Sequence, residues 1–480
     1  MKPDYILPEL MPYFEKWQLV ADCYAGEKAI KDKGELYLPN PSPANEPVEI
    51  KAKRYKDYQT RAVFYNATRK TAKALAGMAF AKYPRFDLPS ALDGIQNDVD
   101  GAGTDLAQHA RRALTMLLLK GRGGLLADFP VSQGGTKAVT KHLKPVIKLY
   151  EPEQIINWRT TANNGQKKLS LVVIKESYIK SDDGFKAEYG EQLLALRLTD
   201  GVATSQIYRN SGSGFAPYTE ESPILDHAQK PFDTIPFSFI GADDNDETID
   251  DAPLYDLAML NIAHYRDSAD YQEGNFIAGQ PTLFITGVTN EWYRDVLQPN
   301  GGVHLGSRVG QILGAGATAQ LLQASTNNAN FEAMQHKEAQ MVALGAKLLD
   351  MGGNKTATQA SAEIAEQTST LATICNNLSD AYSLAMNFLG RFVGADGVAT
   401  VSFNTNFATN KMDAQQRSQL IAEWQAGAIT WGEMRAKLVE DEIATIEDAD
   451  EARGIIESEQ GDGLMGVLND RRDVETNGTH

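Results

Sequence analysis

The longest periodic pattern of apolar residues in this chain lies between residues 360 and 393. Its members are spaced by seven and then by alternating three and four residues: Ile364, Leu371, Ile374, Leu378, Ala381, Ala385, Phe388 and Phe392. This spacing predicts one face of an α-helix about 50 Å long, at a rise of 1.5 Å per residue. A helix with a single apolar stripe needs other helices or subunits to cover it. The chain is therefore expected to fold around a long helix with close neighbours.

Length and composition indicate an ordinary globular protein. The chain has 480 residues, of which 42% are hydrophobic and 23% charged, enough for roughly three domains. Its two cysteines, Cys23 and Cys375, argue against a disulfide scaffold or a multi-cysteine metal site. The longest apolar run, near residues 114–119, is far shorter than a membrane span of about 20 residues. We expect neither a signal peptide nor a membrane segment.

The net charge of −17 has the wrong sign for a protein that grips a polyanion tightly. Charge is unevenly distributed, because residues 51–86 contain ten basic residues and one acidic residue, whereas residues 440–462 are strongly acidic. The basic segment is compatible with a nucleic-acid patch, a solvated helix face or a belt between subunits.

Two kinds of periodicity alternate along the chain. Helical spacing predicts helices over 55–81, 105–120, 251–274, 328–349 and within 413–459. Asp251 is the expected N-cap of the third of these helices. In the last region, Thr430 to Glu433 fits a capping box. Strand-type patterns predict strands at 146–150, 169–174, 192–198, 202–208, 282–286, 303–305 and 309–313. The sequence thus predicts an α+β fold that is mainly helical.

An acidic segment from Asp243 to Asp251 is the one candidate metal site, since it holds six carboxylates within nine residues. It lacks EF-hand spacing, so a solvated loop leading into a capped helix is the alternative interpretation. The glycines of Gly314–Ala319 match a dinucleotide-binding fingerprint only formally, because no βαβ unit accompanies them. The seven histidines show no paired metal spacing. We expect no catalytic residue, no bound metal and no cofactor.

Four stretches of the chain resemble bacteriophage portal proteins, specifically the group with a domain of the DUF4055 type. They are residues 65–71 with Gly77 and Pro84, residues 151–159, the segment from Ile235 through Leu254, and residues 359–361 before the long helix.

The resemblance implies a portal fold with a wing, a stem, a clip and a crown, assembled as a ring of usually twelve subunits. The implied divisions are an N-terminal arm at 1–50, the wing at 51–250, a first stem helix at 251–278, the clip at 279–320, a second stem helix at 321–350, a channel loop at 351–357, a long helix at 358–400 and the crown at 401–480.

Two sets of site residues follow from this resemblance. The DNA-channel loop would consist of Met351, Gly352, Gly353, Asn354, Lys355 and Thr356. Lys355 would form a ring of positive charge that touches backbone phosphates without reading sequence, the alternative being an exposed loop lysine with no role. The ring would also supply neighbours for the long helix, with an intersubunit seam at Leu371, Leu378, Ala385 and Phe392.

The implied function is a non-enzymatic channel for packaging and ejecting double-stranded DNA at one capsid vertex of the virion, after assembly in the host cytoplasm. Implied partners are the terminase large subunit, a head-to-tail adaptor, the major capsid protein, a scaffold protein and DNA bound without sequence preference, with no membrane. Two alternatives remain: a metal-dependent nucleic-acid enzyme that uses Asp243–Asp251, and a coiled assembly scaffold.

Overall fold

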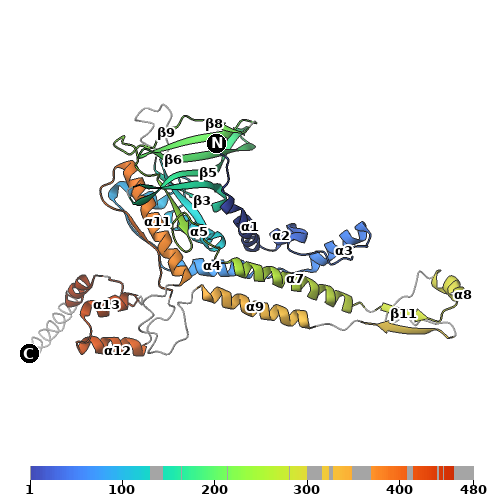
Figure 1. Cartoon of the computed structure of the whole chain (residues 1–480). Coiled ribbons are helices and arrows are strands. Elements are labelled where there is room, and N and C mark those ends of the chain that lie inside the picture. The colour runs from blue at the N-terminus through green and yellow to red at the C-terminus, as the bar shows by residue number, and fades with distance from the viewer. Residues whose placement is uncertain are drawn as a thin grey trace, which may run out of the picture. The chain divides into compact units, whose positions relative to one another are not determined.

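The computed structural model describes residues 2–129, 144–163, 165–212, 214–280, 282–299, 316–323, 328–348, 369–407, 414–440, 443–446 and 448–458 (Figure 1). The chain divides into two compact units, Met1–Thr405 and Asn406–His480. None of the described helices is long and apolar enough to cross a membrane.

Helices and antiparallel strands both contribute to the first unit, which confirms the mixed fold class. Its α-helices are α1 (Met11–Ala25), α2 (Glu27–Asp32), α3 (Val48–Arg61), α4 (Ala67–Ala79), α5 (Leu106–Lys120), α7 (Tyr255–Ala278), α8 (Asn290–Trp292), α9 (Ala329–Lys347) and α11 (Thr370–Val393). The predicted helix at 105–120 is confirmed as α5, which Asp105 caps by accepting a hydrogen bond from the Gln108 amide at 2.8 Å.

The strands of the described residues form four sheets, in which every pairing is antiparallel. The largest sheet has six strands: β4 (Ile155–Asn163), β5 (Gln166–Asp182), β6 (Ala187–Thr199), β7 (Val202–Asn210), β8 (Phe215–Pro217) and β9 (Ser222–Pro223). A second sheet joins β10 (Phe237–Gly241), β2 (Arg122–Asp128) and β3 (Val146–Tyr150). Two-stranded pairs are β1 (Arg85–Asp87) with β13 (Thr400–Ser402), and β11 (Thr282–Thr286) with β12 (Thr318–Leu322).

The tight turn between α5 and β2 depends on a glycine. Gly121 has φ +75°, and a Cβ there would lie 2.5 Å from the carbonyl oxygen of Asp251. Only glycine lets the chain reverse at this point with the segment before α7 packed against it. The turn therefore fixes where α7 leaves the sheet region.

The core of the first unit is built around α11. Its apolar face contacts α5, β2, β10 and β13. Tyr382 is fully buried, with its hydroxyl 2.7 Å from His109 Nδ1 on α5. The ring of Phe392 lies 4.7 Å from that of Phe232, centroid to centroid. The predicted long helix is thus confirmed over 370–393, while residues 358–368 lie outside the described residues.

A second face of α11 carries three polar side chains at intervals of four residues. Ser379, Ser383 and Asn387 accept hydrogen bonds from the backbone amides of Phe403, Val401 and Ala399, at 3.1, 2.9 and 2.9 Å. Residues four apart lie on one helix face, so they form a ladder that holds the β13 segment. This ladder leaves the backbone of that segment with its hydrogen bonds satisfied.

The residues of the predicted intersubunit seam on α11 are covered by their own chain. Leu371, Leu378 and Ala385 are at most 1% exposed in the single subunit, and Phe392 is half-buried between Phe129 and Phe232. Elements of the same chain fill the space that a neighbouring subunit was expected to fill. Periodicity identified the apolar face correctly but cannot tell an intrachain partner from an interchain one.

The predicted helix over 55–81 is in fact two helices. The two helices are separated by a short break, after which Asn66 caps the N-terminus of α4 by accepting a hydrogen bond from the Arg69 amide at 2.9 Å. The fully buried Asn261 holds the same turn, because its side chain donates to the Tyr65 carbonyl and accepts from the Thr68 amide. A capping residue and a long-range partner therefore interrupt a pattern that looked continuous.

The predicted N-cap at Asp251 is also wrong. Helix α7 begins at Tyr255, after Leu254, and that end has no side-chain cap. Asp251 instead accepts a hydrogen bond from the Lys16 ammonium at 2.9 Å. The carboxylate pairs with a lysine on α1, a partner that local sequence does not reveal.

The second unit contains α12 (Ala414–Gln425), α13 (Trp431–Glu440) and a further helical segment at 449–458. The predicted capping box is confirmed: the Glu433 amide donates to Thr430 Oγ1 at 3.2 Å, and the Thr430 amide donates to a Glu433 carboxylate oxygen at 2.7 Å. Trp431 packs its ring 5.3 Å from that of Trp424, which joins the two helices.

Burial of α11 leads to a stability prediction. Leu378→Ala should lower the free energy of unfolding by about 2–5 kcal/mol, and Leu378→Asp by more, because the new charge would be buried without a partner. Leu384 is 45% exposed on the same helix, so Leu384→Asp is the matched control and should cost far less. Denaturant unfolding followed by circular dichroism tests this, and equal midpoints for both Asp variants would contradict the placement of α11.

Candidate functional site

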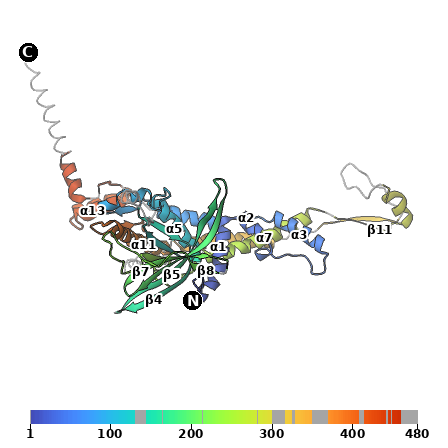
Figure 2. The same cartoon turned by 90° about the horizontal axis from the view of Figure 1, so that it is seen from above.

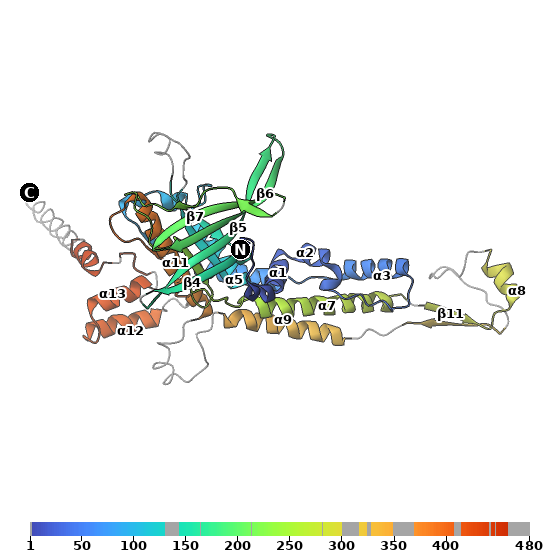
Figure 3. The ribbon, with the colours of Figure 1, turned by 45° about the horizontal axis from the view of Figure 1, so that its top comes forward.

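Two long helices, α7 and α9, lie side by side and carry a small strand pair at one end (Figures 1 and 3). Three side-chain contacts join them: an ion pair of Lys337 with Asp267, His264 Nε2 at 3.1 Å from a Glu338 carboxylate oxygen, and the Tyr271 ring 5.8 Å from that of Phe331. Residue numbers rise along α7 as they fall along α9, so the helices are antiparallel. At 1.5 Å per residue, α7 alone is about 36 Å long.

The strand pair at the end of these helices is open on both sides. Thr282 pairs with Leu322 and Thr286 with Thr318, which confirms the predicted strand at 282–286. Strand β12 was not predicted, and it overlaps the end of the glycine-containing segment Gly314–Ala319. Among the described residues β11 and β12 pair only with each other. Two isolated strands are marginally stable in water, so this ribbon is suited to gaining further partners.

Large apolar side chains are exposed along α7 and α9. They are Met259, Phe276, Ile277, Phe331 and Val342, which are between 42% and 72% exposed. A shallow groove of about 560 Å³ separates the helices near the start of α7, lined by Asp256, Met259, Leu260, Ala263, Gln340, Ala343, Leu344 and Lys347. Phe276 and Phe331 also contact Arg61 and Tyr271 of the same chain, and the apolar surface that remains exposed is of a kind that often marks an interaction site. This surface, the α7–α9 face, is therefore a candidate interface.

The predicted channel loop, Met351 to Thr356 with Lys355, lies outside the described residues. The described elements before and after it along the chain are α9 and α11. The predicted strands at 303–305 and 309–313 also lie outside the described residues.

The acidic segment 243–251 is an ordered loop whose carboxylates bind its own backbone. Asp250 is 7% exposed and accepts hydrogen bonds from the amides of Asp243 and Asp244, at 2.8 and 3.4 Å. Asp246 accepts from the Thr248 amide at 2.6 Å. The described residues contain no group of three His, Cys, Asp or Glu side chains placed to hold a metal ion. The loop reading of this cluster therefore fits the geometry better than the metal-site reading.

A buried arginine anchors that loop. Arg122 is 2% exposed and donates to the carbonyls of Glu247 and Thr248, at 2.8 and 2.5 Å. Its guanidinium lies 4.2 Å from the Trp158 ring centroid and 4.1 Å from that of Phe239. Burial lowers the pKa of Arg122 to about 10, with nearby Asp250 acting in the opposite direction. The side chain therefore stays charged and ties the loop to two sheets.

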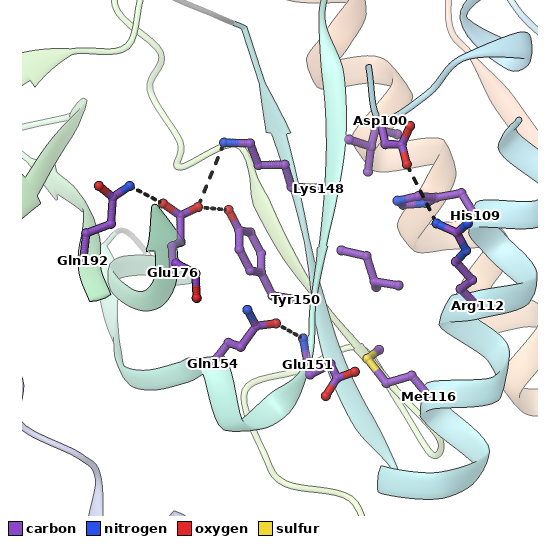
Figure 4. A pocket seen from close by; sticks show the side chains of 13 residues that line it. Asp100, His109, Arg112, Met116, Lys148, Tyr150, Glu151, Gln154, Glu176 and Gln192 are labelled. Carbon is purple, nitrogen blue, oxygen red and sulfur yellow. Dashed lines mark hydrogen bonds and ion pairs between the residues drawn. The ribbon is translucent and has the colours of Figure 1, made fainter. Parts of the chain in front are cut away.

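A polar pocket of about 820 Å³ lies between α5, β3 and the β5–β6 hairpin (Figure 4). Glu176 lines it, with its two carboxylate oxygens accepting hydrogen bonds from the Tyr150 hydroxyl at 2.5 Å and from Gln192 at 3.0 Å. Lys148 lies 4.0 Å from Glu176 and 2.8 Å from Asp128. Each of these side chains already has a partner within the subunit.

Three titratable groups of this pocket, Lys148, Tyr150 and His109, have pKa values displaced from their ordinary values. Burial works against the charge of Lys148, but Asp128 and Glu176 outweigh it and raise the Lys148 pKa. Burial, with the charge of Glu176, raises the pKa of Tyr150 well above its ordinary value. Burial lowers the pKa of His109 to about 4. General acid–base catalysis favours a group whose pKa lies near the working pH, and these shifts move away from it. The pocket therefore has the character of a structural network.

Sequence analysis missed both Arg122 and the Glu176 network. Nothing in local spacing marks them, since their partners come from four strands and one loop far apart in the chain. The one available signal is that Lys148 and Tyr150 lie two apart on a predicted strand, which places them on the same face of it.

The pKa of His109 leads to a pH prediction. Above pH 6.5 the His109 side chain is neutral in both the folded and the unfolded protein. As the pH falls from 6.5 toward 4, the unfolded chain binds a proton at His109 before the folded protein does. The free energy of unfolding therefore decreases over this pH range. The shift corresponds to about 3 kcal/mol. Unfolding free energies at several pH values should fall less steeply in His109→Gln than in the wild type. The exposed His336 is the control, and a slope changed equally by His336→Gln would contradict this.

One family model matches part of the chain. It is described as "Domain of unknown function (DUF4055)" and covers residues 253–393, less than a third of the sequence. The matched region runs from the start of α7 to the end of α11, so it includes the α7–α9 face. The DUF4055-type resemblance is confirmed for this region only. No curated protein matches the chain.

Solved structures of gene transfer agent (GTA) particles contain similar chains. One, from the virion of a native GTA particle, has a TM-score of 0.41 and 16% identity over 88% of this chain and 99% of its own. A second, from a native neck computed with C12 symmetry, has a TM-score of 0.40 and 16% identity over 78% and 89%. A third, from an empty-particle neck with C6 symmetry, has 0.41 and 15% over 86% and 98%. Likenesses this weak assign neither a fold nor a function to the chain.

Proposed function

We propose that this chain is the subunit of a phage-type portal, a non-enzymatic ring through which double-stranded DNA enters and leaves a capsid. The observation that carries the proposal is the α7–α9 face, which exposes five large apolar side chains along two long antiparallel helices. Burying such a face is favourable by about 25 cal/mol per Å² of apolar surface. Copies of the same chain arranged about an axis would bury it repeatedly.

The ribbon of β11 and β12 supports the same arrangement. A two-stranded ribbon with exposed Phe284, Leu321 and Leu322 gains stability when a neighbouring chain adds to it. In a ring, the ribbons of all subunits would gather at one end. That end is the proposed docking site for the terminase large subunit and later for a head-to-tail adaptor.

The net negative charge of the chain favours passage of DNA through a ring over tight binding of DNA. Each copy contributes −17, and affinity for a duplex depends on neutralising phosphates with basic residues. A ring of such subunits would bind DNA weakly and without sequence preference, as a channel requires. The major capsid protein and a scaffold protein are the remaining proposed partners, in a virion with the ring at one vertex.

Substitution on the α7–α9 face tests ring formation. Val342 on α9 and Val398, before β13, are each 72% exposed, so neither contributes much to the fold of one subunit. Val342→Asp should convert rings into free subunits at micromolar concentration, because it places charge in an apolar interface. Val398→Asp is the matched control and should leave rings intact. Mass photometry measures both, and a wild-type protein that remains a monomer would refute the proposed function.

The loop before α11 allows a separate prediction. Lys355→Ala should leave ring assembly unchanged and reduce the DNA content of assembled particles, since a positive ring in the channel would be lost. Lys53→Ala, which removes an exposed lysine from α3, is the control. Particles that contain full-length genomes in both variants would remove the proposed role of Lys355.

A further inference from the structure

The β5–β6 hairpin extends well beyond the sheet that supports it. Strand β4 pairs with β5 only as far as Ile174, and β7 pairs with β6 only as far as Gln192. Beyond these points, residues 177–182 and 187–191 pair only with each other. Figure 3 shows them as a ribbon that projects from the sheet. We call these residues, with the turn 183–186, the arm.

The arm is held in shape at its base and its tip. At the base, the Arg209 guanidinium lies 3.9 Å from the ring centroid of Tyr178 and 3.6 Å from that of Tyr218. At the tip, Asp183 accepts hydrogen bonds from the amides of Phe185 and Lys186, at 2.8 and 2.6 Å. Aspartate side chains that bind the following backbone in this way stabilise tight turns. The arm therefore presents its side chains in a defined position.

Three large apolar side chains on the arm face solvent. Ile179 and Tyr189 form a cross-strand pair and are 57% and 69% exposed, while Phe185 at the tip is fully exposed at 103%. Together they present roughly 500 Å² of largely apolar surface, in the range of patches that usually serve a function on monomers. Phe185 in particular contributes nothing to the packing of its own subunit.

A second apolar patch lies at the opposite side of the same sheet region. Tyr5, Ile6 and Met11 are 50%, 42% and 59% exposed. The Leu7 amide donates to the Ile156 carbonyl at 3.0 Å and so holds this segment beside β4, the edge strand of the sheet. Figure 2 shows the arm leaving one side of the subunit and the N-terminus at the other.

We infer that the arm of one copy binds the N-terminal patch, Tyr5 to Met11, of the next copy. Two different patches on opposite sides make a heterologous contact, which closes into a ring when the rotation between copies is right. A stable interface between two proteins buries about 800 Å² per partner, more than the arm offers. The contact therefore fits a supplementary bond between subunits that the α7–α9 face already brings together, and it rests on the proposed ring.

A cysteine pair tests this contact in the assembled protein. In Phe185→Cys combined with Ile6→Cys, oxidation should link successive subunits and give a ladder of multimers on a denaturing gel. Cys23 and Cys375 are buried, so the wild type should give no ladder. Each single variant, and Phe185→Cys combined with Tyr83→Cys at a 73% exposed position, serve as controls.

The outcomes separate the arm contact from the ring itself. Rings without a ladder above the controls, or a ladder that stops at the dimer, would overturn the arm contact and leave the proposed function standing. Absence of rings, seen by mass photometry before oxidation, would overturn both. The triple variant Ile179→Ser, Phe185→Ser and Tyr189→Ser gives a second measurement. On dilution, its rings should dissociate at a protein concentration several-fold higher than that at which wild-type rings dissociate. The melting temperature of the subunit should be unchanged. Unchanged dissociation would count against the inference.

Discussion

The structure depends on the covering of α11 by its own chain. Leu371, Leu378 and Ala385 are sealed against α5, β2, β10 and β13, and Tyr382 is buried with them. Apolar burial is the main favourable term in folding, so this contact fixes the sheets and helices around one core. Because the apolar face of α11 is buried inside the subunit, that face is not available for contacts between copies.

The surfaces proposed for assembly are of two kinds. The α7–α9 face offers length and several apolar side chains, which suits a principal interface between parallel copies. The arm and the N-terminal patch are smaller and lie at opposite sides of the sheet region, which suits a second contact formed once copies are adjacent. Polar networks such as those of Glu176 and Arg122 serve a different purpose, since they hold the sheets and the 243–251 loop in place.

Sequence reasoning succeeded where a signal was local and periodic. It predicted α5, α9, most of α11, the strand at 282–286 and the Thr430–Glu433 capping box, because propensity, spacing and capping all act within a few residues. It failed where a distant partner decided the outcome. Asn261 divides a predicted helix, Lys16 takes the carboxylate of Asp251, and strands far along the chain cover the α11 seam.

The sequence predicted the helices of the candidate interface but not the exposed apolar residues on them. The resemblance to portal proteins implied two stem helices, but the apolar stripe that suggested subunit contacts lay on α11 instead. On α9 the apolar residues Phe331 and Val342 are too sparse to give a strong pattern, and their exposure appears only once the neighbouring helix is placed. The matched family region spans both helices.

A three-dimensional reconstruction of the purified protein by electron cryomicroscopy tests the central claim most directly. The account predicts a closed ring in which α7 and α9 of each copy pack against the next copy and surround an opening that admits a DNA duplex. A single-copy particle, or a ring whose α7–α9 helices remain in contact with solvent, would contradict it.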